Sequence, residues 1–342
     1  MRSAQILLGS LMLMGMVGCR RDNAEELGSN DPAATPYNLV SPYYFPTVLV
    51  PLDNPLTVEG IELGRRLYYD PLLSTNGPFE GFSCSSCHDQ ALSFCAPNAG
   101  TSVLPHINVA WSRNFLWNGR VQGNVEDIMR FEVQEFFQVD VSVLQADPGY
   151  AARFRRVFGT EVITEDAVAK ALAQWFRRLV SSNSRFDGYI MHVEELTDLE
   201  LTGMMLYLTE TGDCFHCHGL PLMTDNTYHN IGLDSTFVGA DQGRYIITGD
   251  DGDLGKFKAP TLRNVALTAP YMHDGRFQTL EEVVEHYNSG VKRSPSLDPI
   301  MTKPGQTTEL GLDPERKAAL VAFLYTLTDQ SFVTDTALAD PF

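Results

Sequence analysis

Two short cysteine motifs constrain this 342-residue chain more than any other feature of its sequence. The first is Cys84-Ser85-Ser86-Cys87-His88, and the same spacing returns at Cys214-Phe215-His216-Cys217-His218. Two thiols separated by two residues, with a histidine directly after the second, form the spacing that attaches a c-type haem. The thiols bond to the haem, and the adjacent imidazole can ligate its iron. Two copies in a chain with six cysteines predict two covalently attached haem c groups.

The N-terminus predicts an exported lipoprotein. The apolar run from Ile6 to Val17 is too short for a standard membrane-spanning helix, and Met16-Val17-Gly18-Cys19 resembles a lipobox. We therefore expect residues 1–19 to be a lipoprotein signal peptide. Lipid on Cys19 would anchor the protein to a membrane on its periplasm-facing side. The alternative is an ordinary signal peptide with a chance cysteine. The one cysteine not yet assigned, Cys95, has no activating neighbour in sequence and is expected to be a buried structural thiol.

Composition limits the classes of partner. The formal net charge is −18, and an acidic surface repels phosphate, so the sequence predicts no nucleic-acid binding. The same charge could steer a basic partner protein, or it could simply keep the surface soluble. With 44% hydrophobic residues, the chain can build a sizeable core, which we expect to be divided between two domains.

The pattern along the chain predicts a mostly α fold. Residues 20–50 are polar and then proline-rich, which is typical of a tether. Residues 219–258 are rich in glycine and aspartate and predict a long loop. Apolar periodicity and capping residues predict helices over residues 57–69, 164–181, 196–210, 278–288 and 313–327.

A second repeat follows each haem motif. Asn108-Val109-Ala110 is matched by Asn264-Val265-Ala266, and Gly-Arg lies eleven residues after each asparagine, at Gly119-Arg120 and Gly275-Arg276. The same order of landmarks predicts an internal duplication of one cytochrome c-like haem domain. We place the first copy at residues 51–190 and the second at residues 191–342.

The two copies differ where their chemistry would differ. Met272 in the second copy offers a thioether as a sixth iron ligand, and His/Met ligation suits electron transfer. The aligned residue in the first copy is Leu116, which cannot bind iron. The first haem is therefore expected to keep an open position for a small oxidant.

A carboxylate near this open position is a candidate catalytic residue. Glu126 lies seven residues after Gly119, and a pocket carboxylate could take a proton from one peroxide oxygen and return it to the other. The alternative is that Glu126 only begins a helix, as its counterpart Glu281 is expected to do.

In combination, these residues resemble the bacterial di-haem cytochrome c peroxidase family, which includes the MauG-like enzymes. The resemblance covers roughly Leu56 to Leu327. It rests on the segments Cys84–His88, Phe115–Arg120, Ser181–Asp187, Cys214–His218, Ala259–Asn264 and Tyr271–Arg276.

The resemblance implies that hydrogen peroxide is reduced to water at the N-terminal, peroxidatic haem. His88 and Glu126 fall on that haem, whereas His218 and Met272 fall on the C-terminal electron-transfer haem. The electrons would come from a small donor protein, a cytochrome c or a cupredoxin. Relatives are often homodimers, and they bind calcium between the domains. In this chain the carbonyls of Lys258 and Pro260 are the candidate Ca²⁺ ligands.

The chain departs from the family pattern at several positions. His106 is the only histidine left in the stretch where relatives carry a His that caps the resting peroxidatic iron, and we expect a structural or propionate role for it. Phe115 stands where relatives have a pocket Gln. Pro105 stands where relatives place a Trp between the haems, which leaves Trp111 as a weak substitute.

Two other functions stay open. One is a MauG-like oxidase that modifies a partner protein, although Met272 stands where that chemistry is associated with Tyr. The other is a di-haem electron-transfer protein without a substrate, which would need a residue such as His106 to fill the sixth position of the first haem.

Overall fold

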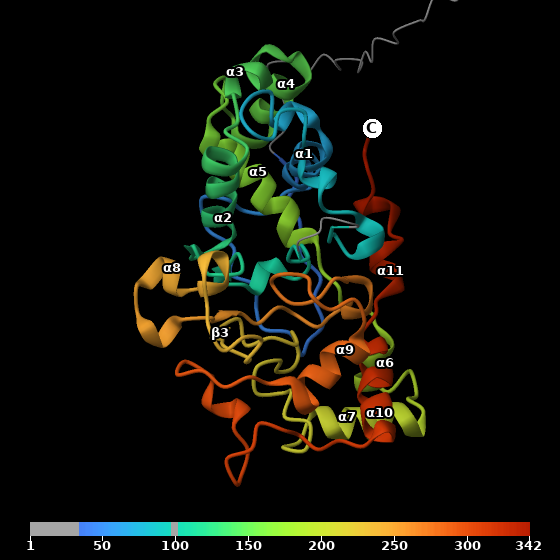
Figure 1. Cartoon of the computed structure of the whole chain (residues 1–342). Coiled ribbons are helices and arrows are strands. Elements are labelled where there is room, and N and C mark those ends of the chain that lie inside the picture. The colour runs from blue at the N-terminus through green and yellow to red at the C-terminus, as the bar shows by residue number, and fades with distance from the viewer. Residues whose placement is uncertain (1–33, 97–101) are drawn as a thin grey trace, which may run out of the picture.

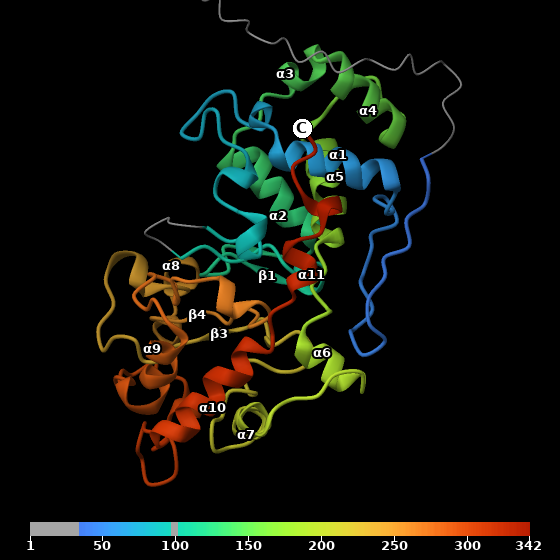
Figure 2. The same ribbon diagram turned by 90° about the vertical axis from the view of Figure 1, so that its right-hand side faces the viewer.

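A computed structural model describes residues 34–96 and 102–342 and shows a mostly helical chain with little sheet (Figure 1). The predicted lipid-bearing Cys19 and the first part of the tether lie outside the described residues. From residue 34 to residue 57 the chain has almost no regular structure and runs along the side of the molecule (Figure 2). In the part of the chain that the structure describes, none of the helices has both the length and the hydropathy needed to cross a membrane.

The helices carry the fold, and the sheets are two-stranded. β1 (Asn114–Phe115) pairs antiparallel with β2 (Val121–Gln122), and β3 (Tyr228–His229) pairs antiparallel with β4 (Phe257–Lys258). The α-helices are α1 (Val58–Tyr69), α2 (Val125–Phe131), α3 (Val141–Ala146), α4 (Pro148–Phe158), α5 (Glu165–Arg178), α6 (Arg185–Ile190), α7 (Asp198–Tyr207), α8 (Tyr245–Thr248), α9 (Leu280–Glu285), α10 (Pro314–Tyr325) and α11 (Gln330–Val333).

The predicted helices are confirmed, with shorter ends in most cases. α1 begins after Thr57, whose hydroxyl accepts a hydrogen bond from the Gly60 amide, and it stops before Asp70-Pro71, as expected. α5 begins after Thr164, which accepts a hydrogen bond from the Ala167 amide. The sequence interpretation did not include α3, α4, α6, α8 and α11, and it gave α2 only as the alternative in which Glu126 begins a helix.

The first hydrophobic core, here called the first core, is built around α1 and α5. The two helices approach closely at Gly64, where a Cβ atom would lie 2.1 Å from the Ala171 carbonyl oxygen. Fully buried aromatic side chains, including Tyr68 and Trp175, fill the space beside this crossing. α2 packs against α5 (Figure 1).

The second core repeats this arrangement with α7 and α10. Here Gly203 is the point of closest approach, because a Cβ atom would lie 1.9 Å from the Ala319 carbonyl oxygen. Tyr207 and Phe323 are fully buried in this core, with their ring centroids 5.1 Å apart. Each haem motif therefore lies against one crossed pair of helices.

The C-terminal segment returns to the first core. Phe332 and Leu338 pack into the first core, although α10 just before them belongs to the second (Figure 2). At the crossover, the carboxylate of Asp329 accepts hydrogen bonds from the backbone amides of Ser182 and Asn183. The proposed segment 191–342 is thus tied to residues 51–190 by its own last part.

Candidate functional site

The first haem motif lines one side of a cavity, here called the first cavity. Cys84 and Cys87 are free thiols beside it. The ring of His88 is held by a hydrogen bond of 2.7 Å between its Nδ1 and the Phe94 carbonyl oxygen, which leaves Nε2 for another partner. Burial lowers the pKa of His88 to about 4, so the imidazole is neutral at pH 7, the form that binds a metal.

The second haem motif lines the second cavity in the same way. Nδ1 of His218 lies 3.1 Å from the Pro260 carbonyl oxygen and 3.3 Å from that of Met223. Burial lowers the pKa of His218 to about 4. Met272, the predicted sixth ligand, lines this cavity together with Cys214, Cys217 and His218. The structure therefore brings the predicted ligands of the second iron to one cavity.

The residues at both cavities fit a covalently bound haem. Each cavity offers two free thiols and a neutral imidazole whose Nδ1 is already oriented by a backbone carbonyl. The remaining walls are mainly apolar, which suits a porphyrin. The assignment of individual iron ligands stays a prediction.

The backbone supports the alignment of Leu116 with Met272. Both residues have a positive φ, +62° and +70°, a conformation that side-chain-bearing residues seldom adopt. Leu116 lines the first cavity, and Met272 lines the second. The landmark residues before and after them also share left-handed backbone: Asn108 and Asn264, and Gly119 and Gly275.

Glu126, the predicted pocket carboxylate, does not line the first cavity. Its two oxygens accept hydrogen bonds of 2.6 Å from Nη1 and Nη2 of Arg177, and the Asn54 amide donates a third of 2.7 Å. Both ionic side chains are almost completely buried. Burial opposes ionisation of Glu126, but the pair with Arg177 prevails and lowers its pKa. Glu126 could reach the cavity only by breaking this pair.

Glu132, a carboxylate that sequence reasoning missed, lines the first cavity, as does Asp225. It lies one and a half turns after Glu126, where α2 passes into a π-helical turn over Glu132–Phe136. A matching π-helical turn, His286–Gly290, follows α9. Among the described residues no side-chain partner is found for Glu132, and burial raises its pKa to about 7. A π-turn at a functional site is common, but its position could not be read from the sequence.

His106 lies beside His88. Their ring centroids are 3.5 Å apart and the planes are nearly parallel, at 18°. Nδ1 of His106 lies 3.2 Å from the Tyr68 hydroxyl. His106 is therefore stacked on the predicted proximal imidazole and does not face it across the first cavity. This position fits the structural role expected for His106 and does not fit a cap on the open side.

The wall between the two cavities differs from the sequence interpretation. Trp117 lines both cavities, as does Pro105, and the Trp117 indole donates a hydrogen bond of 2.9 Å to the Ser102 carbonyl oxygen. Trp111, the predicted substitute, lines only the first cavity and donates to the Pro46 carbonyl oxygen near the surface. Trp117 was missed because it belongs to the repeat block and appeared to be only a landmark.

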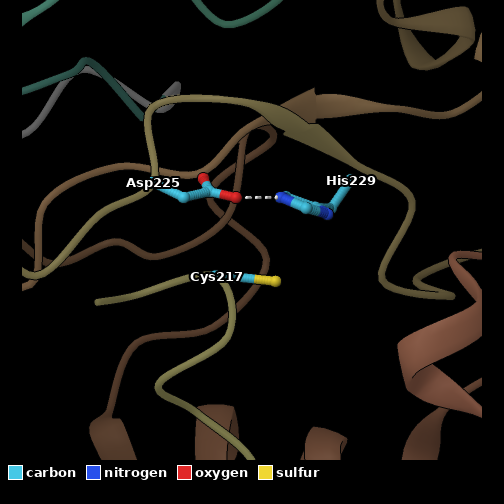
Figure 3. Close-up of side chains that lie close together, drawn as sticks. All are labelled: Cys217, Asp225 and His229. Atoms are coloured by element: carbon cyan, nitrogen blue, oxygen red, sulfur yellow. Dashed lines mark hydrogen bonds and ion pairs between the residues drawn. The ribbon is translucent and has the colours of Figure 1, made fainter.

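An ionic cluster that sequence reasoning missed touches both cavities, because His229 lines the second cavity and Asp225 lines the first (Figure 3). His229 lies 2.8 Å from Asp225 and 2.7 Å from Asp298, and Cys217 is close by. Burial opposes the charged imidazole, but the two carboxylates prevail and raise the pKa of His229 to about 12. His229 is thus a partly buried imidazole held between two carboxylates.

Two smaller predictions can be compared with the structure. Cys95 is buried, as expected, with 2% of its surface exposed. The carbonyl of Pro260, a candidate calcium ligand, is directed at the His218 ring, so it is already used in holding that ring.

Comparisons with known proteins agree with this arrangement. Residues 58–195 match the family described as di-haem cytochrome c peroxidase. The chain is 34% identical over 296 residues to methylamine utilization protein MauG of Methylorubrum extorquens, covering 81% of this chain and 80% of that protein. It is 31% identical over 251 residues to cytochrome c551 peroxidase of Nitrosomonas europaea, covering 68% of this chain and 73% of the relative. The crystal structure of a MauG-like protein associated with microbial copper homeostasis superposes with a TM-score of 0.77 at 31% identity. The superposition covers 89% of this chain and 99% of that protein.

Proposed function

The chain belongs to the di-haem cytochrome c peroxidase family, and we propose that it reduces hydrogen peroxide to water with electrons from a small redox protein. The observation that carries this proposal is the contrast between Leu116 and Met272. Both residues occupy the same backbone conformation in corresponding cavities, but only Met272 can ligate iron. The first cavity thus keeps room for a small oxidant, and the second is suited to electron transfer.

The proton chemistry is proposed for Glu132. Reduction of one peroxide consumes two protons and two electrons and yields two waters. When bound, the haem iron supplies electrons to the O–O bond. Glu132 lines the first cavity, and with a pKa of about 7 it can both accept and donate a proton near neutral pH. Glu126 remains ionised beside Arg177 and is proposed to support the cavity wall from behind.

We further propose that the two haem domains arose by duplication. In support, each half has a crossed helix pair with a glycine at the contact, a left-handed asparagine, and a π-helical turn after the helix that follows the Gly-Arg landmark. Trp117, which lines both cavities, is proposed to lie on the electron path between them.

The first experiment is spectroscopic. Optical and EPR spectra of the oxidised and one-electron-reduced protein should show one high-spin and one low-spin haem, and peroxide should change the high-spin signal. Two low-spin haems that ignore peroxide in both states would leave an electron carrier and overturn the peroxidase proposal.

A matched pair of variants tests the proton role. Glu132→Gln should lower the rate constant for peroxide about 10²-fold, which is typical for loss of a general acid–base group, and should remove an ionisation near pH 7 from the rate profile. Glu126→Gln should retain that ionisation. If the ionisation near pH 7 were lost in Glu126→Gln and kept in Glu132→Gln, the proton-transfer role would belong to Glu126.

A protein-modifying activity is the second candidate, favoured by the 34% identity to a MauG protein. It would appear as peroxide-dependent oxidation of a protein partner without turnover of a small electron donor.

Membrane attachment is a separate proposal. Cys19 is proposed to carry lipid and to hold the enzyme on the periplasm-facing side of a membrane. Cys19→Ala should release the protein into the periplasmic fraction, and unchanged membrane association would contradict the anchor.

A further inference from the structure

Lys258 is a buried lysine whose ammonium has no partner within the described part of the chain. Only 8% of its surface is exposed, and among the described residues its ammonium makes no hydrogen bond or ion pair. Its side chain ends in an ammonium group, which is the ordinary charged form of lysine at neutral pH. A buried charge is costly unless an opposite charge compensates for it. Among the described residues no carboxylate forms an ion pair with Lys258, and only Asp225 is close enough to favour its charged form.

The position of Lys258 shows where a compensating anion would lie. The residue ends β4, where it pairs with Tyr228 of β3, and its backbone amide donates a hydrogen bond of 2.8 Å to the Trp117 carbonyl oxygen. Like Trp117, Lys258 lines both cavities. Its backbone is therefore fixed at the junction of the two candidate haem sites.

The nearest acidic side chain is already engaged. Asp225 is close enough to favour the charged form of Lys258. Its carboxylate, however, is bonded to His229 at 2.8 Å and to the Thr227 hydroxyl at 2.7 Å (Figure 3). The Asp225–His229 pair is held from the other side by Asp298. Because the Asp225 carboxylate is already hydrogen-bonded, the Lys258 ammonium is available to an anion that enters with a ligand.

We propose that Lys258 binds haem propionate carboxylates at the junction of the two cavities. The inference rests on the proposed function only in assuming that haem occupies these cavities. A haem carries two propionates, which are the anions that such a ligand would bring to a buried ammonium. A positive charge held there favours the reduced state of a nearby haem, because reduction adds negative charge.

Redox potentiometry of the intact two-haem protein tests the proposal. In Lys258→Met both haems should remain attached, and the midpoint potential of at least one haem should shift downward. Lys258→Arg should restore most of the shift because it retains the charge. Lys256→Met is the matched control: Lys256 lies two residues earlier and pairs with Asp253 at 3.2 Å, so its loss should leave both potentials unchanged.

The outcomes separate this site from the peroxidase function. Unchanged potentials in Lys258→Met with two haems attached would overturn the propionate site, whether or not the protein reacts with peroxide. If Lys258→Met loses a haem, the midpoint potentials of Lys258→Gln and Lys258→Arg are compared instead. Only Lys258→Arg should retain the wild-type potentials, because it keeps the positive charge. A downward shift in a protein that ignores peroxide would support the site and contradict the peroxidase proposal.

Discussion

At the scale of single residues, two corresponding positions share one backbone conformation but carry side chains that differ in their ability to ligate iron. Leu116 and Met272 share the left-handed conformation, with φ of +62° and +70°. Leu116 already adopts this strained conformation, so a substitution there requires no additional backbone strain. A methionine placed there could present its sulfur to the first cavity much as Met272 does to the second.

Leu116→Met should close the first haem. The variant is expected to show two low-spin haems. If the thioether favours the closed site by ~1.4 kcal/mol, the open fraction and the peroxide rate fall about tenfold. EPR and stopped-flow mixing with peroxide measure both effects. Leu116→Ala, which cannot ligate iron, is the control and should stay high-spin. A high-spin Leu116→Met protein with wild-type kinetics would contradict the assignment of this position.

The Glu126–Arg177 pair gives a second prediction at this scale. Arg177→Met leaves a buried carboxylate without its cation and should cost about 3–5 kcal/mol of unfolding free energy at neutral pH. The pKa of Glu126 is lowered in the folded protein, so the pair stabilises above the unfolded-state pKa and this contribution is lost as pH falls through the folded-state value.

The loss of unfolding free energy caused by Arg177→Met should therefore be smaller at pH 5 than at pH 7.5, because the unpaired Glu126 carboxyl can take up a proton at the lower pH. Urea unfolding at the two pH values measures it. The double variant Glu126→Gln, Arg177→Met should recover part of the loss at pH 7.5. An equal deficit at both pH values would mean that packing, and not charge, accounts for the cost.

At the scale of elements, each half depends on one helix crossing with no space for a side chain. Gly64 faces the Ala171 carbonyl across α1 and α5, and Gly203 faces the Ala319 carbonyl across α7 and α10. Gly64→Ala and Gly203→Ala would each gain up to about 1 kcal/mol of helix propensity. The overlap with backbone should outweigh this gain and leave a net loss of roughly 1–3 kcal/mol.

Thermal or denaturant unfolding measures the effect of the glycine variants. Gly149→Ala is the control, since Gly149 lies in α4 and an added Cβ would meet no backbone there, only the Asp147 carboxylate oxygen at 3.0 Å. That variant should be neutral or stabilised. Stabilisation of Gly64→Ala or Gly203→Ala would show that the helix pairs can separate without cost.

The same elements show how far the sequence could lead. Thr57 and Thr164 cap strongly amphipathic helices, so α1 and α5 could be predicted from local patterns. The haem motifs and the Leu116–Met272 contrast are also local in sequence, and their side chains line the expected cavities. Glu132 could not be found this way, because a π-helical turn and the packing of α2 on α5 turn it toward the cavity. For the same reason, no local pattern indicated that Arg177 pairs with Glu126.

At the scale of the whole molecule, the net charge of −18 should affect how fast the proposed electron donor associates with the protein. A surface of one sign steers a donor of opposite sign and speeds its association, and dissolved salt screens this attraction over about 8–10 Å at physiological ionic strength. The second cavity, with Met272 and His218, is where such a donor is proposed to deliver its electrons.

We therefore expect kcat/KM for a basic c-type cytochrome to fall as ionic strength rises. An acidic donor should show the opposite trend, because salt screens its repulsion. The reaction of the pre-reduced enzyme with hydrogen peroxide is the internal control: peroxide is neutral, so its rate constant should change little over the same range. A donor rate that does not respond to salt would show that the acidic surface serves solubility alone, and the choice of donor would then depend on local contacts near the second cavity.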